Sequence, residues 1–365
     1  MYFSDNLSKG NTIYQDISQY PFIPGLYSPV YPLVVSLPVK IFGLSYVTGR
    51  VVSIIAALLI GIVLYKIVRL KARRLISLVA PLLFFASSYI FNWSVLYRVD
   101  VLGLLFCLIG VFIILKYENR RLVYLSIPFF LLAVFTKQSY LVAPAASFIY
   151  LAFRSKMLAA KFGVMFGGLL VLLFLLGNYL TNGQLYLHLI TYQNLSPVLD
   201  WTIKRYSEFL VVHAVIFILS LSFAIYGIIR KRHLLLAIYF IIAAIAATTV
   251  GRPGAAGNYF LELIALCCVL IVLLIMELEQ YINKGSLAGI LISTGLVLQL
   301  FLFVHLPVEN LTRDMQANRE LSALIKSTPG DILSEDAGMV VTNGKTLFVE
   351  WRIYNKWDCG TSRLS

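Results

Sequence analysis

Long runs of apolar residues dominate the chain, and short polar or basic stretches separate them. Most runs are about 15 to 22 residues long, and an α-helix needs about 20 residues to cross a hydrocarbon core of about 30 Å. Helices fit this pattern because an open backbone cannot be satisfied in lipid. The pattern predicts an all-α polytopic membrane protein with about ten crossings, at 47–67, 76–96, 101–117, 122–136, 139–153, 162–180, 209–229, 233–250, 259–278 and 286–305.

Composition supports this class and argues against a nucleic-acid-binding protein. Hydrophobic residues make up 60% of the 365 positions and charged residues only 13%. The mean hydropathy of +0.85 is far above that of soluble domains. The net charge of +13 comes mostly from short loops between apolar runs, not from a basic soluble domain. We therefore expect no nucleic-acid partner.

The basic loops orient the predicted helices. By the positive-inside rule we expect a cytoplasmic position for the clusters at 66–74, 116–121, 154–161 and 230–232, and for Lys284. Most of the polar groups that are unfavourable within a membrane then lie on the opposite, outer face. They lie in 1–45, 98–100, 136–138, 181–208, 251–258 and everything after 306. The sequence thus predicts a cell-membrane protein whose active face is extracellular or periplasmic.

The first residues carry no signal for export. Segment 1–28 is polar and lacks the basic start and apolar core of a signal peptide. An even number of crossings nevertheless places it outside, so we expect that a preceding transmembrane helix is missing from this sequence. Segment 29–43 is apolar but short, and three prolines interrupt it, which favours one or two interfacial helices. The alternative is a further crossing, which would invert the N-terminus.

Two acidic residues on the outer side are candidates for function. Asp100 begins a predicted helix just after Arg98, where an acid is favoured by the helix dipole. A simple helix cap paired to Arg98 would explain it as well. Glu262 lies one turn inside an apolar helix, on the same face as Asn258. Ionisable groups within spans are costly and suggest function, although an interhelical hydrogen bond is the alternative.

Lys137 is the strongest single candidate for a functional residue. The apolar runs on either side of it are about 15 residues long, or about 22 Å of helix, which is short for an average bilayer. The turn between them should lie below the outer surface, where Lys137 could meet a phosphate with Thr136 and Gln138 as further donors. The alternative is that the long side chain simply lifts its ammonium to water.

The remaining candidates are weaker. The glycine-rich loop 251–258, with Arg252, could bind an anion before a helix, but no strand precedes it as in a P-loop. Loop 181–208 contains His188 among aromatic residues that would also suit an interface belt. The four histidines show no ligand spacing, so a divalent metal is conceivable but unsupported, and the cofactor stays unknown.

Several short motifs resemble one family of membrane enzymes. They are Tyr14-Gln15-Asp16, Pro21-Phe22, Tyr27-Ser28-Pro29, Tyr31-Pro32, Phe42-Gly43, Gly49-Arg50, Arg98-Val99-Asp100, Thr136-Lys137-Gln138 and Asn258-Tyr259-Phe260-Leu261-Glu262. The order of these motifs along the chain and their expected side of the membrane resemble those of GT-C glycosyltransferases. The resemblance is to the superfamily of protein O-mannosyltransferases and lipid A aminoarabinose transferases in particular. The resemblance covers roughly residues 1–305 and implies a GT-C-like helical bundle.

The resemblance also implies a reaction. A sugar would move, with inversion, from a polyprenyl phosphate-linked donor to an acceptor hydroxyl on a protein, lipid or glycan. The family places its catalytic base, a carboxylate, upstream of Met1, so Asp16 and Asp5 are substitutes in the same loop. Asp100 matches the family's second acidic position and would organise the acceptor or the active site. The donor phosphate would meet Lys137, Gln138 and Arg252, and the cavity would be lined by Arg98, Asn258, Tyr259 and Glu262.

The tail after the last crossing is predicted to be a small external α/β appendage. Segment 309–327 has a helical pattern, and 331–350 reads as short strands around a turn at 342–345, because Asn-Gly favours a tight hairpin. We therefore expect three parts: a first external loop with interfacial helices at 1–45, a transmembrane glycosyltransferase domain at 46–306, and a truncated external C-terminal appendage at 307–365.

Two other functions stay open at this stage. A transporter or flippase of lipid-linked sugars would also carry polar groups at the outer ends of its helices, although no inverted repeat is evident. A non-catalytic assembly subunit of the cell envelope would tolerate replacement of Lys137 and Glu262. The absence of polar groups on the inner half of the predicted helices favours the enzyme.

Overall fold

The computed structural model describes residues 1–18, 22–118, 120–193, 196–279, 294–295, 298–299, 303, 311–332, 334 and 336–347. The chain divides into two compact units, and each is described by itself. The first unit comprises Met1–Val52, Leu173–Asn194 and Leu306–Ser365, and the second comprises Ser53–Leu172 and Leu195–His305.

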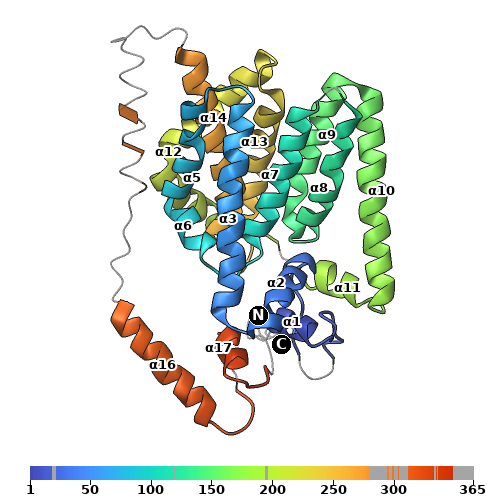
Figure 1. Cartoon of the computed structure of the whole chain (residues 1–365), viewed down its shortest axis with the longest axis vertical. Helices are drawn as coiled ribbons and strands as arrows, with labels where there is room; N and C mark the ends of the chain where they lie inside the picture. The colour runs from blue at the N-terminus through green and yellow to red at the C-terminus, as the bar shows by residue number, and fades with distance from the viewer. Residues whose placement is uncertain are drawn as a thin grey trace. The chain divides into compact units, whose positions relative to one another are not determined.

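The second unit is a helical bundle whose long helices run side by side (Figure 1). Its elements, some of which extend into the first unit, are α3 (Tyr46–Arg69), α4 (Arg74–Ser77), α5 (Val79–Ala86), α6 (Ser88–Ser94), α7 (Asp100–Lys116), η1 (Arg121–Leu125), α8 (Ser126–Val134), η2 (Gln138–Leu141), α9 (Val142–Arg154), α10 (Lys156–Leu180), α12 (Leu199–Ile229), α13 (Leu234–Ala246), η4 (Ala247–Gly251), η5 (Gly257–Phe260) and α14 (Leu261–Glu279). This all-α architecture confirms the predicted fold class.

Helix α14 forms the core of the bundle, whereas α10 lies at its edge. Every residue of α14 from Leu263 to Leu273 is buried, and the helix packs against α5, α7, α12 and α13. A helix that is apolar on all sides is stable only where apolar surroundings cover it. In α10 only Ala159 and Phe162 are buried, so the rest of this apolar helix is suited to contact lipid.

Helix lengths correct the predicted number of crossings. Five described helices are long and apolar enough to span a membrane: Tyr46–Arg69, Lys156–Leu180, Leu199–Ile229, Leu234–Gly251 and Gly257–Glu279. A sixth would be the pair Arg74–Ala86 and Ser88–Ser94, which is bent by 69°. The predicted crossings at 101–117, 122–136 and 139–153 are helical but shorter, and 286–305 lies mostly outside the described residues. The described part of the chain therefore gives five to six spans instead of about ten.

The first unit contains short helices. They are α1 (Tyr2–Ser8), α2 (Val30–Phe42), α11 (Gln184–Tyr186), η3 (Leu187–Thr191, a π-helical turn), α16 (Leu311–Ser327) and α17 (Ala337–Thr342). Segment 29–43 forms the single helix α2, and its 13 residues are too few to cross a bilayer. This length favours the interfacial interpretation, which remains a prediction.

The tail differs from its prediction. Helix α16 confirms the expected helical segment, but Ala337–Thr342 forms helix α17 where we expected a strand. The Asp336 side chain caps this helix by accepting a hydrogen bond of 3.1 Å from the Met339 N–H, and Gly344 follows its end with a φ of 74°. The Asn-Gly pair therefore follows the end of a helix, a position that favours a glycine with left-handed φ just as a hairpin turn does. In the described tail, β-structure is limited to an isolated bridge between Ile332 and Leu347.

Candidate functional site

A buried carboxylate in the second unit gathers donors from three separate segments. Asp100, the first residue of α7, is fully buried. Its Oδ1 accepts hydrogen bonds of 2.7 Å from Lys137 Nζ and 2.7 Å from Asn258 Nδ2. Its Oδ2 accepts a bond of 3.2 Å from Arg98 Nε. Residues that are 158 positions apart in the sequence thus meet at one carboxylate.

The Lys137 side chain points inward. It leaves the turn between α8 and η2, is only 7% exposed, and places Nζ 4.3 Å from the centre of the Tyr259 ring. A buried ammonium needs a counter-charge, and here both the Asp100 carboxylate and an aromatic face supply it. The alternative of a side chain that lifts its charge to water is therefore wrong for this structure.

A close helix approach holds this turn against α7. The Tyr140 ring packs over Gly103, where an added Cβ would lie 2.3 Å from Tyr140 Cε2. The Tyr140 hydroxyl donates a hydrogen bond to the backbone carbonyl of Asp100. Because glycine leaves room for the ring, the turn that carries Lys137 lies directly beside the start of α7.

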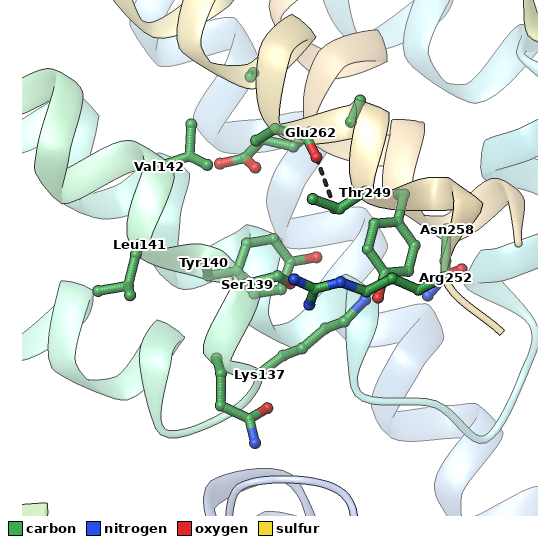
Figure 2. A pocket seen from close by; sticks show the side chains of 14 residues that line it. Lys137, Ser139, Tyr140, Leu141, Val142, Thr249, Arg252, Asn258 and Glu262 are labelled. Atoms are coloured by element: carbon green, nitrogen blue, oxygen red, sulfur yellow. Dashed lines mark hydrogen bonds between the residues drawn. The ribbon is translucent and has the colours of Figure 1, made fainter. Parts of the chain in front are cut away.

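A cavity of about 240 Å³ opens beside this cluster (Figure 2). Figure 2 shows the Arg252 side chain extending across the cavity near Lys137. Arg252 is exposed, and its guanidinium has no ion-pair partner among the described residues. The cavity is lined by Lys137, Gln138, Ser139, Tyr140, Leu141, Val142, Ala243, Ala246, Ala247, Thr249, Arg252, Asn258, Tyr259 and Glu262.

Six of the predicted site residues thus line one cavity, and two lie behind it. Lys137, Gln138, Arg252, Asn258, Tyr259 and Glu262 are lining residues. Arg98 was expected in the lining but contacts Asp100 from another side, with its guanidinium 4.8 Å from the centre of the Trp93 ring. Asp100 itself is covered by its partners.

The polar wall of the cavity has unused hydrogen-bonding capacity. Buried Asn258 Oδ1 and the buried Nε2 of Gln138 have no hydrogen-bond partner among the described residues. Unsatisfied buried polar groups are costly, so a polar ligand in the cavity would be favoured. Glu262 accepts a hydrogen bond from the Tyr239 hydroxyl and adds a carboxyl group to the same wall.

The charge balance defines what Asp100 can do. Lys137 and Arg98 stabilise its ionised form, and Asn258 adds a hydrogen bond to it. Opposite charges and donors that favour the ionised form make a carboxylate a weak base. The arrangement therefore suits Asp100 to hold Lys137 and Asn258 in place.

The other predicted acids belong to the first unit. Asp5 of α1 pairs at 2.6 Å with Lys9, which follows the end of this helix. Asp16 is exposed, and the Ser18 backbone N–H donates to its Oδ1 at 2.9 Å, which lowers the pKa of Asp16. Neither contact indicates a catalytic role, so both assignments remain predictions.

His188 has a structural position in the same unit. The Gly25 N–H donates to its Nδ1 at 2.7 Å, and its Nε2 lies 2.8 Å from the Gln15 carbonyl oxygen. Both ring nitrogens are thus occupied by backbone groups, which fixes the neutral form with the proton on Nε2. This arrangement ties the N-terminal segment to η3.

Sequence reasoning missed Gly103, Tyr140 and Tyr239. A glycine in an apolar helix and tyrosines in apolar runs carry no distinctive spacing, so only the packing identifies them. As to metals, no group of three or more His, Cys, Asp or Glu side chains that could hold an ion occurs within the described ranges.

Part of the chain is similar to a family of membrane glycosyltransferases. Residues 26–179 match the family model of dolichyl-phosphate-mannose-protein mannosyltransferases. This segment includes Asp100 and Lys137 but not Arg252, Asn258 or Glu262. The match confirms the resemblance to the protein O-mannosyltransferase superfamily of GT-C enzymes. No curated protein matches the chain.

Two solved structures share the fold. One is the crystal structure of the Archaeoglobus fulgidus oligosaccharyltransferase with Zn and sulfate, at 13% identity and a TM-score of 0.56. The other is the archaeal oligosaccharyltransferase AglB from Archaeoglobus fulgidus with an inhibitory peptide and a dolichol-phosphate, at 12% identity and a TM-score of 0.53. Each alignment covers 90% of this chain, but 51% and 54% of the respective structures. This chain spans about half their length.

Proposed function

We propose that the protein transfers a sugar from a polyprenyl phosphate-linked donor to an acceptor hydroxyl at the outer membrane face. The observation that carries this proposal is the cavity beside Asp100, where Lys137 and Arg252 approach from different parts of the chain. A sugar phosphate donor presents a phosphodiester, and its departure leaves a lipid phosphate with an additional negative charge. Cations fixed where this charge develops lower the barrier to transfer.

The two cations have different roles in this proposal. Lys137 is buried and oriented by Asp100, so it provides a fixed charge at the cavity wall. Arg252 is exposed and has a planar guanidinium that can bind two phosphate oxygens at once. Gln138 Nε2 is a further donor in the wall. The dolichol-phosphate bound in the solved AglB structure supports a polyprenyl phosphate as the donor class.

The reaction would proceed by direct displacement. A base removes the proton of the acceptor hydroxyl, the acceptor oxygen forms a bond to the anomeric carbon, and the bond to the lipid phosphate oxygen breaks with its electron pair. One displacement inverts the anomeric configuration. Asp100 acts here as a positioning residue, and Asp16 and Asp5 remain predictions for the base. A peptide bound in the AglB structure favours a protein acceptor over a lipid or glycan.

Charge asymmetry supports the outer face as the position of the cavity. Lys116 ends α7, the helix that begins at Asp100, and Arg154 ends α9, which follows the turn of Lys137. Arg230 follows the end of α12. Cytoplasmic loops carry an excess of Lys and Arg. This asymmetry supports an extracellular or periplasmic position for the cavity.

The first test is sugar transfer in membranes with radiolabelled polyprenyl phosphate sugars. The protein with Arg252→Ala is compared with wild type and with Lys204→Ala, a control that removes an exposed lysine of the same unit outside the cavity. We expect Arg252→Ala to reduce transfer by about 10²-fold, because it removes one stabiliser of the leaving phosphate. The control should transfer normally.

Lys137→Ala should cause an equal or larger loss, and its folding is checked in parallel because it leaves Asp100 without its main partner. Normal transfer by Arg252→Ala and Lys137→Ala would disprove the assigned phosphate site. A wild-type protein that releases no lipid phosphate but moves the lipid-linked sugar across vesicle membranes would instead establish the transporter alternative.

A further inference from the structure

A second cavity, of about 480 Å³, lies in the same unit at the other ends of the helices. Helix α13 contributes Leu234 to it and Ala246 to the first cavity, and α14 contributes Glu277 here and Glu262 there. On α14 the 15 positions between these glutamates correspond to about 22 Å along the axis. The second cavity is therefore separate from the proposed donor site.

Cationic groups surround this cavity. Its charged lining consists of Lys71, Glu118, Arg154, Lys231, Arg232 and Glu277, and His233 adds an imidazole. The carboxylates already have partners: Glu118 Oε2 lies 2.9 Å from Arg154 Nη2, and Glu277 Oε2 lies 2.5 Å from Arg232 Nη1. Lys71 and Lys231 have no ion-pair partner among the described residues. The lining thus carries two uncompensated positive charges.

The backbone of the turn between α12 and α13 brings three of these groups together. Lys231 and His233 adopt left-handed φ values of 53° and 49°, which are uncommon for residues other than glycine. The turn holds Lys231, Arg232 and His233 along one wall of the cavity. No side chain caps the start of α13, so the N–H groups of its first turn add positive potential at Leu234, Leu235 and Leu236, which also line the cavity.

The rest of the lining is apolar. It includes Leu70, Leu115, Phe153 and Met276, and the Phe153 side chain is 67% exposed. A free inorganic anion would gain nothing from such a wall, whereas the acyl chains of a lipid would pack against it. Basic pockets between membrane helices at their cytoplasmic ends are suited to lipid phosphates.

We propose that this cavity binds the phosphate headgroup of a membrane lipid, with Lys71 and Lys231 as its ligands and the apolar wall in contact with its chains. The site does not depend on the proposed sugar transfer. It is expected to select lipids by phosphate charge, because the two unpaired lysines match the charge of a phosphate monoester.

Native mass spectrometry of the delipidated full chain in detergent tests this site. The probes are dioleoyl phosphatidic acid, diacylglycerol with the same chains, and inorganic phosphate. The variant Lys71→Ala/Lys231→Ala is compared with the control Lys66→Ala/Arg230→Ala, which removes two exposed cations next to the same segments but outside the cavity. Both variants lose the same net charge, and thermal unfolding checks that both fold.

We expect phosphatidic acid to bind wild type and control equally, and the Lys71→Ala/Lys231→Ala variant at least about 10-fold more weakly, given the attraction of each cation to a lipid phosphate. Diacylglycerol should not bind. If millimolar inorganic phosphate competes with phosphatidic acid, the phosphate group alone is recognised. If it does not compete and the Lys71→Ala/Lys231→Ala variant still binds phosphatidic acid 10-fold more weakly, the whole lipid is recognised. Equal weakening in both variants, unchanged binding in both, or equal binding of diacylglycerol would overturn the proposal.

Discussion

The two ends of the second unit use positive charge in opposite ways. At the Asp100 end, Lys137 is buried and its ammonium is 2.7 Å from a fully buried carboxylate. At the opposite end, Lys71 and Lys231 are exposed and lack such a partner in the described structure. A buried charge is stable only when it is paired, whereas an exposed charge is solvated by water until a ligand arrives.

The difference in burial and pairing distinguishes residues that stabilise the fold of a site from residues that only contribute to its surface. Removing a buried partner leaves an uncompensated charge inside the protein, so loss of function and loss of stability arrive together. Removing an exposed lysine changes binding but little else.

The largest effect is expected for Asp100→Ala. This change leaves Lys137 and Arg98 without their carboxylate, and breaking a buried pair costs about 3–5 kcal/mol of unfolding free energy. Glu208→Ala, which breaks the exposed pair with Arg205 at 3.1 Å, should cost less than about 1 kcal/mol. Thermal unfolding in detergent is followed with a thiol-reactive dye, because Cys107, Cys267 and Cys268 are buried and free. Equal shifts for both variants would show that Asp100 is not a structural centre.

A medium effect is expected for Gly103→Ala. The new Cβ would meet the Tyr140 ring and displace the turn that carries Lys137, at a cost of about 1–3 kcal/mol. Gly167→Ala in α10 is the control, since nothing lies within 4 Å of the added atom and alanine favours a helix. Sugar transfer should fall in the first variant, while phosphatidic acid binding at the opposite end stays unchanged. If Gly103→Ala lowers both sugar transfer and phosphatidic acid binding, the two ends of the second unit are coupled.

The smallest effect concerns His188, a buried but neutral polar group of the first unit. Burial lowers the pKa of His188 below its ordinary value of 6.5, so the unfolded chain takes up a proton first as the pH falls. Its stabilising contribution is complete above about pH 6.5 and decreases as the pH falls from there towards the lower folded-state pKa. Hydrogen exchange at the Gly25 amide, corrected for the intrinsic rate, should therefore accelerate between pH 7.5 and 5.5. The variant His188→Gln should not show this acceleration. If the acceleration persists in the variant, it arises from the titration of another group.

The apolar pattern was sufficient to predict where helices occur. The start of α7 at Asp100 and the helical character of the predicted crossings within the described ranges follow directly from runs of Leu, Ile, Val and Phe. Within the described residues the predicted number of spans was too high, because the apolar pattern does not fix the length of a helix, as in α8 with its 9 residues. The strand prediction for 337–342 was wrong because Asn-Gly occurs after helix ends as well as in hairpin turns. Here the Asp336 side chain caps the start of a helix over these residues.

The sequence also singled out residues that the structure brings together in the candidate site. It singled out Lys137, Asn258 and Asp100 because ionisable and amide groups at helix ends stand out in an apolar chain. Whether Lys137 would rise to water or turn inward was open, since the same four-carbon side chain can do either. The answer depended on a carboxylate 37 positions away and an aromatic ring more than 100 positions away.

The sequence by itself determined the membrane class, the helical composition and the candidate residues, because these depend on local hydrophobicity and on the cost of charge in lipid. The tertiary structure decided which charges are paired, which helices are central, and that two separate cavities lie at opposite ends of the same helices. Such properties depend on contacts between segments distant in sequence, as when Gly103 admits the Tyr140 ring and so places Lys137 beside Asp100.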